Sequence, residues 1–212
     1  MKKNLLFNIF LLTFLFLVYG CTNNQKSKSQ DNNTTQATGD STKNMKTGTF
    51  YADTENSKIE WIGKKPTGSH NGNIKIQKGF ISTDENGNII QGEFIFDMNT
   101  INCTDLEGKK KESIEGHLKD SDFFDTSKHP TASFVISKEE KGTIFGTLTI
   151  KGISQEISFN YNYISDLQLE AEILVDRTLF DIKYKSKSVF PDLGDHFIND
   201  YFKIILNPII FK

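Results

Sequence analysis

The stretch from Thr143 to Tyr163 constrains the fold of this chain more than any other. Apolar residues alternate with polar ones on both sides of the Lys151-Gly152 pair. A side-chain period of two predicts two strands, each with one apolar and one polar face. The short Gly-bearing connection predicts that they form an antiparallel hairpin. Such a hairpin cannot bury its apolar face alone, so other strands must close over it.

The same alternation recurs on both sides of this hairpin, in short segments separated by turn residues. One of these turns contains Asn86-Gly87, a pair that suits a hairpin. Eight or more strands of this kind are typical of a sandwich or a barrel, and closure into a barrel would remove exposed edges. Further strands are predicted around residues 59–61, 74–76, 94–98, 132–136, 169–175, 180–184 and 202–206.

One segment, Thr104 to Lys119, has helical spacing instead. Leu106, Ile114 and Leu118 fall on one face, and Thr104 followed three residues later by Glu107 has the form of a capping box. Two glycines in the segment weaken the helix and blur its limits. The spacing predicts a single short helix packed across one end of the sheet.

Residues 1–20 have the form of an export signal. Lys2 and Lys3 precede an almost wholly apolar run from Leu5 to Val18, which is shorter than the roughly 20 residues of a membrane span. The run ends at Gly20-Cys21, which resembles the bacterial lipobox, although Tyr19 is bulkier than that motif prefers. The resemblance implies that Cys21 becomes a lipidated first residue. An ordinary secretory signal with an incidental cysteine is the alternative.

Residues 22–46 are almost entirely polar and too poor in apolar residues to offset the entropy of ordering. The sequence therefore divides into a lipoprotein signal peptide (1–20), a lipidated Cys and polar tether (21–47) and a folded domain (48–212). No acidic cluster of the kind that marks surface export in relatives from gliding bacteria follows Cys21. The expected location is the cell envelope, as a membrane-anchored lipoprotein facing the periplasm.

Charge and cysteine content exclude two classes of protein. The formal net charge is −2, and removal of residues 1–20 with their two lysines leaves 23 basic and 27 acidic groups, a net charge of −4. Nucleic-acid binding calls for a basic surface, which this composition does not supply. The two cysteines, Cys21 and Cys103, provide no disulfide framework.

Four segments of the chain resemble the YceI-like family. Residues 116–125 (GHLKDSDFFD) and 128–134 (KHPTASF) are similar to its signature "hL.s.dFFd…yPtatF". Residues 146–153 are similar to its "G.LTi.Gvt" segment, and residues 177–184 to its "R..FgI.Y" segment, with Asp181 where Gly is usual. The resemblance covers about residues 49–212.

The resemblance implies an all-β fold: an eight-stranded antiparallel, lipocalin-like barrel with one short helix near one end. It also implies an apolar interior that holds a polyisoprenoid or other long-chain lipid, with no cofactor and no established catalytic residues. The expected partners are that lipid and a membrane reached through the lipid anchor, with a homodimer as a further option.

The inward positions of the predicted strands are rich in aromatic residues, which could line a narrow tube around such a chain. Simple filling of the barrel by these side chains is the alternative. The residues expected to line the cavity and bind the ligand are Trp61, Phe94, Phe96, Met98, Phe134, Ile136, Leu148, Phe159, Tyr161, Tyr163, Ile173, Phe180 and Tyr184.

Residues that could carry chemistry are few. No two of the four histidines have a metal-ligand spacing, and the sequence predicts no metal site. Cys103 is interpreted as a partly buried bystander, and the acids between Asp120 and Asp125 as turn and capping residues rather than calcium ligands. Three functions therefore compete: a lipid carrier, which is favoured, a packed barrel acting as an envelope stress or interaction module, and an enzyme on a lipid-like substrate.

Overall fold

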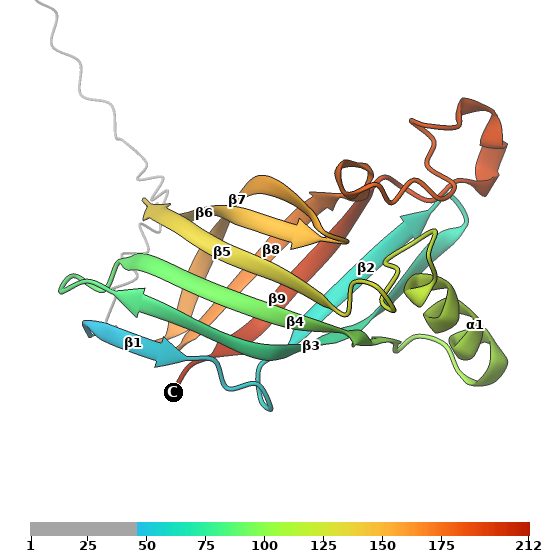
Figure 1. Cartoon of the computed structure of the whole chain (residues 1–212). Coiled ribbons are helices and arrows are strands. Elements are labelled where there is room, and N and C mark those ends of the chain that lie inside the picture. The colour runs from blue at the N-terminus through green and yellow to red at the C-terminus, as the bar shows by residue number, and fades with distance from the viewer. Residues whose placement is uncertain (1–45) are drawn as a thin grey trace, which may run out of the picture. The chain divides into compact units, whose positions relative to one another are not determined.

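The computed structural model describes residues 46–212, in which nine antiparallel strands form one sheet that closes on itself (Figure 1). The predicted signal peptide and Cys21 lie outside the described residues. The strands are β1 (Gly48–Tyr51), β2 (Ile59–Lys65), β3 (Gly68–Thr83), β4 (Ile89–Cys103), β5 (Thr131–Glu140), β6 (Thr143–Ile150), β7 (Ile153–Ser165), β8 (Gln168–Asp176) and β9 (Tyr201–Ile210).

The ring of strands contains eight positions. Its order is β3-β2-β9-β8-β7-β6-β5-β4, and β4 pairs back onto β3. β1 and β2 share one position, because β2 pairs with residues 68–74 of β3 while β1 pairs with residues 80–83 of the same strand. The predicted eight-stranded antiparallel barrel is therefore confirmed.

The hairpin predicted between Thr143 and Tyr163 is formed by β6 and β7. Its two strands pair in unbroken register from Thr143↔Asn160 to Ile150↔Ile153. The connecting residues Lys151 and Gly152 both have positive φ, 54° and 74°, as a two-residue turn that matches strand twist requires. The alternating apolar side chains of β6 point inward, and Ile144 and Ile150 are buried.

Two inward glycines make room for aromatic rings on neighbouring strands. A Cβ atom on Gly79 would lie 2.4 Å from the ring of Phe94, its partner across the β3–β4 ladder. A Cβ atom on Gly146 would lie 2.7 Å from the ring of Phe134. Real Cβ atoms do not come this close to a ring. The rings of Phe94 and Phe134 can therefore occupy these positions only because Gly79 and Gly146 have no side chain.

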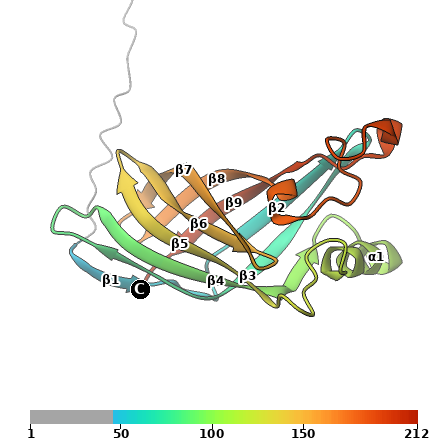
Figure 2. The ribbon, with the colours of Figure 1, turned by 45° about the horizontal axis from the view of Figure 1, so that its top comes forward.

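The helix α1 (Gly108–Lys119) lies at one end of the barrel, and β1 lies at the opposite end (Figure 1, Figure 2). The predicted helix exists, but the capping box is wrong. The cap residue is Glu107, without a side-chain cap, and the hydroxyl of Thr104 donates instead to the carbonyl of Asn71. Leu118 is the buried residue of α1 and packs beneath it into the barrel.

The strand predicted over residues 180–184 is wrong. The chain there forms a 3-10 helix, η1 (Arg177–Phe180), whose first turn is capped by the Asp176 carboxylate accepting from the backbone N–H of Thr178 at 2.9 Å. Asp181 ends it in the left-handed conformation at φ 58°. Alternating burial of Phe180 and Ile182 arises because this segment folds under α1, not because it is extended. A second 3-10 helix, η2 (Pro191–His196), lies in the loop that follows.

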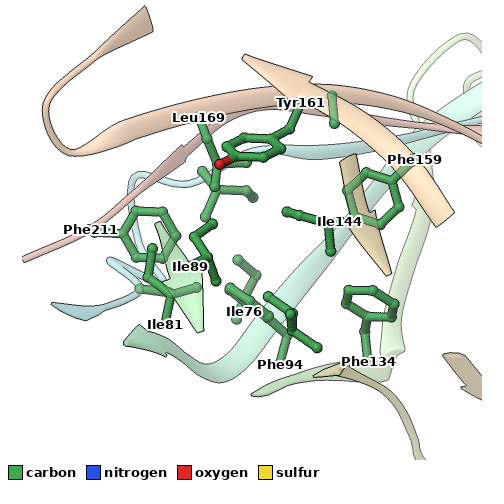
Figure 3. Close-up of a cluster of buried hydrophobic side chains, with 14 of the residues drawn as sticks. Ile76, Ile81, Ile89, Phe94, Phe134, Ile144, Phe159, Tyr161, Leu169 and Phe211 are labelled. Atoms are coloured by element: carbon green, nitrogen blue, oxygen red, sulfur yellow. The ribbon is translucent and has the colours of Figure 1, made fainter. Parts of the chain in front are cut away.

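Buried side chains form two clusters, one toward each end of the barrel. The cluster near β1 draws side chains from nearly every strand, and Figure 3 shows Phe134, Ile144 and Phe159 turned toward a common interior. The other cluster lies against α1 and includes Trp61, Leu118 and Phe180. No helix within residues 46–212 combines the length and apolar character that a membrane crossing requires.

Candidate functional site

A cavity of about 170 Å³ runs through the barrel and is lined by residues of both core clusters. Its wall reaches from Gly63 at the α1 end to Ile81 at the β1 end. His70, which pairs with Gly63, precedes Ile81 by eleven residues on β3, a separation of roughly 35 Å along a strand. The surface shown to the cavity is carried by apolar atoms. A long and narrow apolar space of this kind suits a slender hydrocarbon rather than a compact polar ligand.

Most of the residues predicted to line the cavity lie on its wall. They come from six strands and alternate with outward residues as the period of two requires. Those on the wall are Trp61, Phe94, Phe96, Met98, Phe134, Ile136, Leu148, Phe159 and Ile173. Their contact with a ligand stays a prediction.

Four predicted lining residues lie off the wall, for two reasons. Tyr161 and Tyr163 are on β7 near the β1 end, where their rings pack edge to face at 5.3 Å and help to plug that end. Phe180 and Tyr184 belong to the irregular segment after β8. Phe180 is a buried member of the α1 cluster, and Tyr184 packs against that cluster. The Tyr184 ring lies 4.3 Å from that of His117 on α1.

The α1 end of the cavity is its mouth. Exposed Asn199 and half-exposed Gly63 and Ile198 all line the cavity, so its wall reaches solvent there. At the opposite end, Ile89 and Phe211 are buried members of the core that do not line the cavity. The cavity therefore opens beside α1 and ends near β1.

Arg177 holds the loop that borders this mouth. Its side chain is 2% exposed and donates to the carbonyls of Ile182 at 2.7 Å, Ile198 at 2.9 Å and Asn199 at 3.0 Å. Burial lowers the pKa of Arg177, while Asp200, 3.8 Å away, acts in the opposite direction. An arginine remains protonated at any physiological pH, so the guanidinium is a permanent clamp between η1 and the 198–200 segment.

The hydroxyl groups of Tyr161 and Tyr163, near the β1 end of the barrel, stay protonated. Burial is the main reason that the pKa of Tyr161 is raised, followed by the neighbouring Tyr163. Burial also raises the pKa of Tyr163 to about 12, against a weaker opposing effect of the Tyr161 hydroxyl. Neither group supplies a charge near the cavity, which agrees with an apolar ligand.

The acids of the family signature form turns, as predicted. The Asp120 carboxylate accepts from the backbone N–H of Ser121, and buried Asp125 accepts from the Ser127 hydroxyl and pairs with Lys128 at 3.0 Å. These bonds shape the loop that leads from α1 to β5.

Sequence reasoning missed a cluster formed by His70, Cys103 and Asp105. Nδ1 of His70 lies 2.9 Å from one carboxylate oxygen of Asp105, and the Cys103 thiol donates to the other at 3.1 Å. Cys103 is fully buried rather than partly buried, and burial raises the pKa of its thiol. Burial alone would raise the pKa of Asp105, but hydrogen bonds led by that from the Asn71 N–H lower it to about 2. His70 is 33 residues from Cys103, so only strand pairing brings them together.

The closed antiparallel barrel and its apolar cavity define a lipocalin-like barrel with an internal cavity. Comparison with known proteins identifies the family. Residues 50–207 match the YceI-like domain, and the chain belongs to this family.

The chain is also similar to proteins of known sequence and of known structure. A UPF0312 protein of Staphylococcus aureus (strain USA300) is 37% identical over 54 residues, which are 26% of this chain and 32% of that protein. The chain thus spans about a third of the length of the curated relatives it matches.

Two solved structures share the fold at low identity. BcnA of Burkholderia cenocepacia has a TM-score of 0.57 and 17% identity, over 74% of this chain and 98% of BcnA. A polyisoprenoid binding domain from Saccharophagus degradans, implicated in plant cell wall breakdown, has a TM-score of 0.56 and 14% identity, over 79% of this chain and 99% of that domain.

Proposed function

We propose that this protein binds the hydrocarbon chain of a polyisoprenoid or a similar amphiphilic lipid inside its barrel. The observation that carries the proposal is the continuous apolar cavity that opens beside α1 and is plugged near β1. The polyisoprenoid-binding relative from Saccharophagus degradans has the same fold and supports the same ligand class. Each five-carbon unit buried would contribute on the order of 3–4 kcal/mol, at ~0.8 kcal/mol per CH₂-sized group.

The size of the cavity restricts how such a lipid is held. At about 170 Å³ it is smaller than the roughly 300–1,000 Å³ of most small-molecule pockets. It is close to the ~150 Å³ of an engineered protein cavity that takes up benzene. Because this volume is spread along the barrel, the space is narrow at each point. A long chain is therefore expected to turn aside rings such as those of Phe134 and Phe159 and so to widen the barrel.

The same small volume favours one competing function, a packed barrel that serves as an envelope interaction module and holds no lipid. The two functions differ in one measurable property, the presence of a lipid in the purified protein. An enzymatic role has less support, because the cavity surface carries apolar atoms rather than convergent polar groups.

We further propose that the barrel acts in the cell envelope, attached to a membrane through lipidated Cys21 and facing the periplasm. The Gly20-Cys21 junction after the apolar run supports this location. Such an anchor would keep the barrel close to the bilayer in which its ligand is dissolved.

Native mass spectrometry of the protein, purified from membranes in mild detergent, tests the lipid proposal. We expect a lipid adduct that organic extraction identifies as a long-chain isoprenoid or acyl lipid. Protein that carries no lipid, and that takes up none from vesicles containing polyprenol, would support the packed barrel instead.

A further inference from the structure

The ladder of β3 and β4 brings His70, Cys103 and Asp105 to one place beside the cavity mouth. His70 pairs with Gly63, which lines the cavity, and Cys103 pairs with Gly72, which in turn pairs with the wall residue Trp61. Residues paired across a ladder share a face of the sheet. The imidazole and the thiol therefore both belong to the inner face of the barrel, at its open end.

The three side chains present donor atoms of three kinds at metal-binding distance. Nδ1 of His70, Sγ of Cys103 and a carboxylate oxygen of Asp105 all lie within 4.8 Å of one another. The ligand atoms of a tetrahedral zinc site are about 3.3–3.6 Å apart, given zinc–ligand bonds of roughly 2.0–2.3 Å. The separations of 2.9 Å and 3.1 Å, each to a different oxygen of Asp105, would need to widen by a few tenths of an ångström. The His70 and Cys103 donors lie within 4.8 Å of each other and would adjust to the same spacing as the ion binds.

The surrounding structure holds these donors in place. The backbone N–H of Asn71 donates to the Asp105 carboxylate at 3.0 Å, and the N–H of Thr104 donates to the Asn71 carbonyl at 2.9 Å. The N–H of Cys103 donates to Glu115 on α1 at 2.8 Å. Donors fixed by such second contacts bind a metal with little further ordering.

We propose that His70, Cys103 and Asp105 form a binding site for a borderline divalent cation of the Zn²⁺ type. Imidazole and thiolate select such an ion over Ca²⁺ and Mg²⁺, which prefer six or more oxygen ligands. On binding, the Cys103 thiol releases its proton to solvent, and the imidazole proton moves through water from Nδ1, where it faces the Asp105 carboxylate, to Nε2. Sγ and Nδ1 can then each donate an electron pair to the metal.

The site keeps one side open to water. Cys103 is fully buried, whereas the side chains of His70 and Asp105 are 29% and 27% exposed. The cation enters from the exposed side and completes its coordination with water there. One thiolate and one carboxylate neutralise the two positive charges of the cation. The occupied site next to the apolar mouth therefore carries no net charge.

Zinc titration of the full-length chain, produced without a histidine tag, treated with chelator and kept in detergent, tests this proposal. A chromophoric competitor reports affinity and stoichiometry. We expect one Zn²⁺ per chain, and we expect His70→Gln, Asp105→Asn and Cys103→Ser each to weaken binding by about 100-fold or more. Cobalt in place of zinc should give a thiolate-to-metal charge-transfer band that Cys103→Ser abolishes.

Matched controls separate this site from adventitious binding. Cys21→Ser, His196→Gln and Asp122→Asn change the same residue types elsewhere in the chain and should leave the zinc affinity and the cobalt band unchanged. His70→Gln and Asp105→Asn act on partly exposed groups, so they test the site even if Cys103→Ser unfolds the barrel. The proposal would be overturned if the unaltered chain bound no Zn²⁺. It would also be overturned if His70→Gln and Asp105→Asn bound Zn²⁺ as tightly as the unaltered chain does.

Discussion

Arg177 is the residue on which the mouth of the barrel most depends. It is buried, yet its guanidinium satisfies three backbone carbonyls of segments that have no ladder of their own. Removing one partner of such a set leaves the others buried and unpaired, which costs more than the pair itself contributes. The family signature marks this arginine, but only the structure shows that it binds backbone rather than ligand.

Replacing Arg177 by Met should lower the free energy of unfolding by about 3–5 kcal/mol. Methionine fills much of the same volume but cannot donate to Ile182, Ile198 or Asn199. Urea unfolding followed by circular dichroism measures the change. Lys203→Met is the control: its ion pair with Glu172 lies on the surface and should contribute less than about 1 kcal/mol. Equal stability of the two variants would show that the clamp is dispensable.

At the scale of the elements, α1 covers part of the barrel end at which the cavity opens. The helix contributes little apolar surface apart from Leu118, which lies beside Phe123 and Phe180 in the same cluster. A helix of 12 residues is marginal by itself in water. Its docking therefore depends largely on this side chain.

Leu118→Asp should destabilise the protein by about 3–5 kcal/mol, through loss of buried hydrocarbon and burial of an unpaired charge. The melting temperature reports the loss. Lys110→Asp, on the exposed side of the same helix, should change the free energy of unfolding by no more than about 0.5 kcal/mol. If the Leu118→Asp variant had the same melting temperature as the unaltered protein, α1 would not be docked on the barrel.

The sequence predicted the strands better than it predicted the segments between them. The alternation of apolar and polar residues in β6 and β7 predicted strands correctly, because a sheet with one buried and one exposed face imposes a period of two on its residues. The same alternation at Phe180 and Ile182 led to a wrong prediction, because Phe180 ends a 3-10 turn and Ile182 follows its left-handed cap, and both are buried without being extended. The helix began later than expected since Thr104 bonds to Asn71, a partner 33 residues away that no local motif reveals.

The sequence could predict those site residues whose inward position depends only on the alternation within one strand. It could not predict groups of residues that come together only when the strands pair into a closed barrel. Phe134 and Phe159 were expected on the wall from their inward positions alone. Tyr161 shares that face but does not line the cavity, and its ring packs edge to face against Tyr163. The grouping of His70 with Cys103 depends on the register of β3 against β4, which the order of residues does not contain.

At the scale of the whole molecule, the cavity should discriminate among lipids by length. Phe134→Trp adds a larger ring to the wall, so it should weaken binding of long prenyl chains more than of short ones. Displacement of a fluorescent fatty acid by prenols of increasing length measures this. Val135→Trp is the matched control, because Val135 is the outward neighbour and 47% exposed. Equal loss for every chain length would argue against a tubular site.

The proposed anchor makes a separate prediction for the whole chain. Cys21→Ser should move the protein from the membrane fraction to the soluble fraction without changing its melting temperature, because both core clusters lie within residues 46–212. Fractionation after a high-salt wash and a thermal melt of each form provide the measurements. Continued sedimentation with membranes would contradict attachment through this cysteine.

The pairing of Tyr51 with Lys212 has a practical consequence for sensing lipid uptake. Their backbones exchange two hydrogen bonds, of 2.9 Å and 2.8 Å, at the end of the barrel away from α1. A fluorophore or a surface linkage placed at Lys212 would therefore leave the opening beside α1 unobstructed. With a second dye on exposed Lys110 of α1, energy transfer between the two ends of the barrel would follow any change in their separation when a long chain enters, so that the protein would report its own occupancy.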